Sequence, residues 1–144
     1  MLPDTLRPKV WVVLIGTNDI GIPSCSADRT FVRIVSVVQY LQTQRPESKI
    51  LLHGLLPRGE KMGSAQLGEK LEAVVRVNQQ LQAYADQDPN MTYLDVASVF
   101  LRDNEENGGQ EINAATMPDS LHPNVDGLLA WAPLIETELS KLLR

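Results

Sequence analysis

The chain has 144 residues, 43% of them hydrophobic, and a formal net charge of −5, which is typical of a single soluble domain. The negative charge argues against nucleic acid as a partner, since a phosphate backbone recruits Lys and Arg. There is no run of about 20 apolar residues to span a membrane, and Met1–Asp4 lacks the pattern of a secretory signal. A segment before Met1 could carry such a signal, so the location stays open, with the cytoplasm favoured.

The first predicted element is a strand at Val10–Ile15, a continuous apolar run that indicates burial on both faces of a parallel sheet. Gly16 ends it, and ligands of open α/β sheets bind at this carboxyl edge. A glycine allows close approach of a substrate, and the Asn18 amide can donate to a developing oxyanion, an effect of about 3–4 kcal/mol. Asp19 fits an Asx-turn better than a functional acid.

The remaining apolar patterns alternate between helix and strand, as in α/β proteins, with no repeat or linker to indicate a second domain. In chain order we expect a helix between Ser26 and Arg45, a strand at Ile50–Leu56, a helix outlined by Leu67–Tyr84, a strand at Met91–Val96, a long polar loop around Asn107–Gly109, and a helix at Val125–Leu143 kinked at Pro133. The polar loop is equally compatible with a substrate mouth and a solvated connection. We interpret His53, within the second strand, as a packed residue and not a catalyst.

A second polar motif, Asp119-Ser120-Leu121-His122-Pro123, precedes the last helix. Pro118 and Pro123 bracket it, so this segment should be extended or turning. The Asp119 carboxylate could accept a hydrogen bond from one imidazole nitrogen of His122 and leave the other free as a general base. Taken in isolation, the motif is more typical of a turn-capping aspartate beside a surface histidine. One His and one Asp without a Cys partner do not make a zinc site, so no metal is expected.

The two motifs together, Gly16-Thr17-Asn18-Asp19 after a buried strand and Asp119-x-x-His122-Pro123 before a terminal helix, resemble the SGNH, or GDSL-type, ester hydrolases. Residues 49–61 and 77–81 look like the platelet-activating-factor acetylhydrolase catalytic (α) subunits within that family, and the resemblance runs from about Pro8 to Leu143. It implies a flavodoxin-like three-layer α/β/α fold around a parallel sheet. It also implies an oxyanion donor at Asn18, a substrate loop at Gly16 and Thr17, and Asp119 and His122 as members of a Ser-His-Asp triad.

The chain departs from this family in lacking its nucleophile. The family's serine lies in a Gly-Asp-Ser motif after the first strand, and a second glycine donor follows in a later loop; neither is present. No serine of the chain has a glycine-flanked sharp turn around it, Ser120 is too near His122 along the chain, and Cys25 is a lone thiol. We therefore expect residues 1–144 to be the carboxyl-terminal portion of a single domain that lacks two strand-helix units, about 60 residues.

Two functions fit these residues. The first is cleavage of a small-molecule carboxylic ester by a triad whose serine lies outside the chain, without metal or organic cofactor. The alternative is a catalytically inactive remnant that serves as a binding or interaction module. A nucleotide-binding domain is disfavoured because there is no glycine-rich phosphate loop. In the family the strand matching Val10–Ile15 pairs with the absent first strand, so this strand should have an open edge and the chain alone should self-associate.

Overall fold

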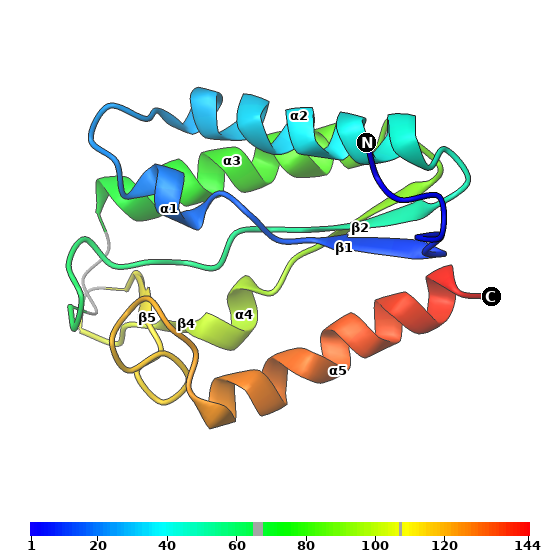
Figure 1. Ribbon diagram of the computed structural model, residues 1–144. Coiled ribbons are helices and arrows are strands. Elements are labelled where there is room, and N and C mark those ends of the chain that lie inside the picture. The colour runs from blue at the N-terminus through cyan, green and yellow to red at the C-terminus, as the bar shows by residue number, and fades with distance from the viewer. Residues whose placement is uncertain (65–67, 107) are drawn as a thin grey trace.

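The computed structural model describes residues 1–64, 68–106 and 108–144. Three parallel strands form the sheet in the order β1-β2-β3. Helices α2 and α3 lie against one face and α5 against the other (Figure 1). The strands are β1 (Val10–Val13), β2 (Lys49–His53) and β3 (Met91–Leu94), and the helices are α1 (Thr17–Ile20), α2 (Ala27–Gln44), α3 (Glu69–Ala85), α4 (Ala97–Phe100) and α5 (Val125–Leu142). The expected α/β class, with a parallel sheet between helical layers, is confirmed.

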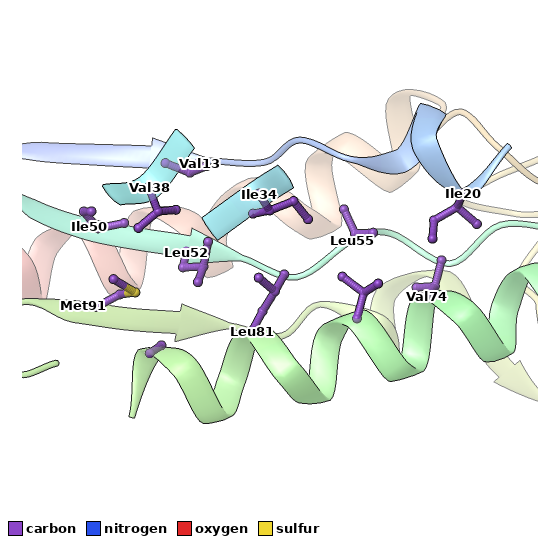
Figure 2. Close-up of a cluster of buried hydrophobic side chains, with 12 residues drawn as sticks. Val13, Ile20, Ile34, Val38, Ile50, Leu52, Leu55, Val74, Leu81 and Met91 are labelled. Carbon is purple, nitrogen blue, oxygen red and sulfur yellow. The ribbon is translucent and has the colours of Figure 1, made fainter. Parts of the chain in front are cut away.

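The predicted helix that follows the first motif forms as α2, and its ends have local causes. The Ser26 side chain accepts a hydrogen bond from the backbone N–H of Arg29 at 3.3 Å, which is an N-cap. Ile34 and Val38 are buried in the predicted stripe. Figure 2 shows them packed with Val13 and Leu52 of the sheet and Leu81 of α3. This apolar cluster holds α2 and α3 on the sheet, and so fixes the end of β1 that leads to the first motif.

The second core cluster lies on the other face of the sheet and secures α5. Leu51 of β2, Phe100 of α4 and Met117 are fully buried there, and Trp131 of α5 packs against them. The rings of Phe100 and Trp131 meet edge to face with centroids 5.9 Å apart. Residues 113–124, which contain the second motif, are therefore tethered at one end by buried Met117 and at the other by α5.

The predicted strand at Val10–Ile15 forms as β1, Val10–Val13, but the prediction that it is buried on both faces is wrong. Strand β1 ends at Val13, only Val13 of its residues is buried, and Val12 is 46% exposed. The cause is position: β1 is the end strand of the sheet and pairs only with β2 among the described strands. An apolar sequence indicates that a strand belongs in a core, but burial also requires a neighbouring strand on each of its two edges.

Two other elements differ from expectation. Strand β2 ends at His53, because the backbone of Leu55 hydrogen-bonds to the side chain of Asn78. Leu55 N donates to Asn78 Oδ1 at 2.7 Å, and Asn78 Nδ2 donates to Leu55 O at 2.9 Å. The polar loop contains an antiparallel hairpin of β4 (Leu101–Asp103) and β5 (Gln110–Ile112). The helix predicted at Val125–Leu143 forms as α5, Val125–Leu142, with Pro133 inside it. Two predicted positions, Leu67 and Asn107, lie outside the described residues. Among the described residues, no helix has the length and apolar character to cross a membrane.

Candidate active site

The Asp119 and His122 side chains form a hydrogen-bonded pair, with 2.7 Å between Asp119 Oδ2 and His122 Nδ1. The other carboxylate oxygen accepts the backbone N–H of His122 at 2.6 Å and that of Leu121 at 2.9 Å. These bonds, the backbone N–H of His122 foremost, lower the pKa of Asp119 to about 2. The carboxylate is therefore ionised and fixed, and it accepts from Nδ1 in a way that leaves Nε2 of the imidazole available. The His122 side chain is 68% exposed, so a substrate can reach it.

The turn that carries this pair is held in an uncommon backbone conformation. Ser120 has a φ of 62°, in the left-handed region that non-glycine residues rarely adopt, and it is 4% exposed. Its N–H donates to Met117 O at 3.0 Å. Directly after the turn, the Asn124 side chain caps α5 by accepting from Gly127 N at 2.9 Å. The turning, non-helical segment predicted between the two prolines is confirmed.

Two residues separate the end of β1 from the first motif, whose residues 17–19 form most of α1, a single helical turn. Gly16 has a φ of 110°, and a Cβ there would lie 2.8 Å from Ile34 Cδ1, so both conformation and space require glycine. Within the described part of the chain, no hydrogen bond engages the Asn18 side-chain amide. Asp19 instead forms an ion pair with Arg33 of α2. The interpretation of Asp19 as structural therefore holds, but its partner is this guanidinium and not an Asx-turn.

The two motifs lie at the same end of the sheet, beyond the carboxyl ends of the strands (Figure 1). The connection after β2 links them. Arg58 Nη1 donates to Thr17 O at 2.6 Å, while Gly59 N donates to Ser120 O at 2.9 Å and Gly63 N to Asp119 O at 2.8 Å. Arg58 and Gly59 were not among the site residues predicted from the sequence. The available signal was a Leu-Pro-Arg-Gly stretch after a buried strand, which on its own indicates only a turn.

The other histidine of the chain, His53, has a structural role, as predicted. His53 is 1% exposed, its Nδ1 lies 2.5 Å from Gly54 O, and its Nε2 accepts from Trp131 Nε1 at 2.8 Å. Burial lowers its pKa. Both ring nitrogens are thus engaged in the core, which leaves His122 as the histidine with a free nitrogen. The described residues contain no group of three His, Cys, Asp or Glu side chains placed to hold a metal ion.

Comparison with known proteins identifies the family of this chain. The family model for GDSL-like lipases and acylhydrolases matches residues 2–128. The chain belongs to this family. It is 35% identical over 98 residues to platelet-activating factor acetylhydrolase IB subunit alpha2 of Gallus gallus, covering 68% of this chain and 39% of that protein. It is 30% identical over 139 residues to subunit alpha1 of Bos taurus, covering 96% and 53%.

A solved structure shares the fold. A protein of Bacteroides fragilis assigned as an acylhydrolase superposes with a TM-score of 0.74 at 27% identity, covering 95% of this chain and 64% of that one. This family member therefore spans between about two fifths and two thirds of the length of the relatives cited here.

Proposed function

We propose that residues 1–144 form the carboxyl-terminal portion of a single SGNH domain, within a serine hydrolase that cleaves a carboxylic ester of a small molecule. The observation that carries the proposal is the 2.7 Å contact between Asp119 Oδ2 and His122 Nδ1, made by an imidazole side chain that is 68% exposed. Membership of an acylhydrolase family and relatives named as acetylhydrolases support it. The serine belongs to a part of the protein outside this chain.

The proposed reaction proceeds through an acyl-enzyme. His122 Nε2 takes the proton of the serine hydroxyl as its oxygen bonds to the ester carbonyl carbon, and the electron pair of the C=O bond moves to the oxygen. The Asn18 amide donates to this oxyanion, beside the Gly16-Thr17 backbone. Collapse breaks the bond to the alcohol oxygen, which leaves with the proton from His122. A water molecule then repeats both steps and releases the acid.

Asp119 performs two tasks in this reaction. It accepts the N–H of Nδ1, which sets the tautomer with a free Nε2, and its negative charge stabilises the imidazolium formed when Nε2 takes the proton. The lowered pKa of Asp119 keeps that charge present at any pH at which His122 acts as a base. The chemistry calls for no metal and no organic cofactor.

The test uses the native protein isolated from its source. We expect an intact mass above the 16.0 kDa of this chain, hydrolysis of p-nitrophenyl acetate, and labelling by a fluorophosphonate probe. His122→Ala should lower kcat by about three orders of magnitude or more, and Asp119→Asn by about 10²- to 10⁴-fold. Asp126→Asn, which removes a carboxylate from the first turn of α5, is the matched control and should keep full activity. Unchanged turnover in His122→Ala would refute the proposal.

A second candidate is a binding or interaction module without catalysis. The observation in its favour is that no hydroxyl of residues 1–64, 68–106 or 108–144 hydrogen-bonds to His122 Nε2. The same experiment separates the two candidates. A native mass of 16.0 kDa, with neither turnover nor fluorophosphonate labelling, favours the module.

We further propose that the chain, expressed alone, self-associates through the segment Val10–Ile15. Its outer edge has no strand partner among the described residues, Val12 and Ile15 are 46% and 40% exposed, and the segment contains no charged residue to oppose edge pairing. Sedimentation of the 144-residue chain should show dimers or larger species. Val12→Lys should reduce them, while Val32→Lys, at a 60% exposed site on α2, should not. A monodisperse monomer with cooperative unfolding would contradict this.

A further inference from the structure

Arg58 makes an unusual set of contacts for a charged side chain beside a candidate active site. Its Nη1 donates to Thr17 O at 2.6 Å, and a Cβ added at Gly21 would lie only 3.3 Å from Nη1 and 3.4 Å from Nη2. Its Nε is shielded from solvent and has no hydrogen-bond partner in the described part of the chain. No carboxylate of the described residues lies within ion-pair distance. The guanidinium is thus held against the two ends of α1 by a backbone carbonyl and by packing.

The residues after Arg58 hold the other motif. Gly59 N donates to Ser120 O and Gly63 N to Asp119 O. A Cβ at Gly59 would lie 3.0 Å from Ser120 Cβ, so the loop and the turn approach as closely as glycine allows. Two backbone donors therefore fix the turn at Asp119 and Ser120, on the same short segment whose side chain fixes Thr17.

We propose that Arg58 is a positioning residue that sets the Asn18 amide relative to the His122 imidazole. The two segments approach from elements far apart in sequence, and residues 58–63 bond to both. Asn18 directly follows the carbonyl that Arg58 binds, and His122 follows the turn that Gly59 and Gly63 bind. Small displacements of catalytic groups lower rate much more than binding, because the geometry is required in the transition state. The catalytic consequence rests on the proposed function, whereas the physical link between the two motifs does not.

The first experiment measures amide hydrogen exchange in the 144-residue chain. Arg58→Met keeps the apolar stem and removes the donors, and Arg58→Lys keeps a charged donor. Losing a charge-assisted bond to Thr17 should speed exchange in residues 17–21 and 58–63 by about tenfold or more. Arg58→Lys should restore most of the protection. Arg29→Met is the matched control, because Arg29 Nη1 also donates to a loop carbonyl, Ser24 O at 3.2 Å, but away from the turn. It should leave both segments unchanged.

The second experiment measures ester turnover in the complete hydrolase. Arg58→Met should lower kcat about tenfold or more with little change in KM, and Arg58→Lys should recover most of kcat. If His122→Ala abolishes turnover while Arg58→Met leaves kcat unchanged, the positioning role is wrong and the proposed function stands. If His122→Ala has no effect, the proposed function is wrong, and hydrogen exchange alone decides whether the link exists. Should Arg58→Met not fold, Arg58→Gln, too short to span to Thr17, takes its place. Unchanged exchange in either variant overturns the inference.

Discussion

Trp131→Phe should destabilise the protein because it leaves a buried acceptor without its donor. Trp131 Nε1 donates to His53 Nε2 at 2.8 Å, and His53 is 1% exposed, so no solvent can replace the lost N–H. A buried polar atom left unsatisfied costs about 1–3 kcal/mol. For a domain of this size each kcal/mol shifts Tm by about 2–4 °C, so we expect a decrease of about 2–12 °C. The edge-to-face contact of the two rings, with centroids 5.2 Å apart, is largely kept by phenylalanine.

A double-mutant cycle isolates this bond from the packing around it. His53→Leu alone leaves the Trp131 N–H and Gly54 O unpaired, whereas His53→Leu with Trp131→Phe removes both partners of the shared bond. The double variant should therefore lose less stability than the sum of the singles, by about 0.5–3 kcal/mol. Denaturant midpoints at one fixed protein concentration measure this. Equal midpoints for Trp131→Phe and its parent, or strictly additive losses, would refute the reasoning.

The same bond predicts a pH dependence of definite sign. Burial lowers the pKa of His53 in the folded state below its unfolded value of about 6.5. Below that value the unfolded chain binds a proton that the folded chain does not. The free energy of unfolding should thus fall as pH falls from about 6.5, and remain full above it. The hydrogen bond to Gly54 O and, to a smaller extent, the charge of Asp95 partly oppose this lowering of the pKa. In His53→Leu this part of the pH dependence should be absent.

Three further predictions concern the turn before α5 and the first turn of that helix. Carboxyl ¹³C NMR should give a pKa of about 2 for Asp119. The contribution of Asp119 to stability is therefore present above its unfolded pKa of about 3.9 and is lost as pH falls toward 2. His122→Ala should raise the pKa of Asp119 only in part, because the backbone N–H of residue 122 remains. Ser120→Gly should keep or raise the melting temperature by relieving a φ of 62°, whereas Ser120→Val should cost about 1–3 kcal/mol; equal melting temperatures for the two variants would show that the conformation is unstrained. Gly127→Ala should cost about 1–3 kcal/mol in thermal unfolding, because its Cβ would collide with Thr116 O and lie 3.1 Å from Phe100 Cε1; an unchanged melting temperature would contradict this.

The features predicted from sequence are those whose cause is local. Helical periodicity located α2 and α5, and the Asp119–His122 contact was accessible because both residues belong to one turn between prolines. The hairpin of β4 and β5 was missed because its strands are largely polar. Of its three residue pairs, Arg102 and Glu111 form an ion pair, with 2.5 Å between Nη2 and Oε1, and only Leu101 and Ile112 are both apolar, so there is no apolar alternation to detect.

The missed parts of the site depend on contacts between distant segments. Arg58 donates to a backbone carbonyl. Every residue has a backbone carbonyl, so the residue type of Thr17 does not identify it as the partner of Arg58. Gly59 is required by the proximity of Ser120, a residue that reaches it only through the fold. The open side of β1 was expected from the family's strand order. The exposure of Val12 was not expected, because an apolar run does not show how many strands lie next to it.

Under the proposed function, the open edge of β1 and the missing serine concern the same end of the sheet. Parallel strands end at the same side of a sheet, so a strand pairing in parallel with the outer edge of β1 would finish beside Gly16 and Asn18. One added strand could therefore cover Val12 and bring a serine toward His122. We expect a preceding segment of the native protein, supplied with this chain, to abolish self-association and to give ester turnover together. A segment that prevents association without any turnover, even when it contains a serine, would favour the binding module over the hydrolase.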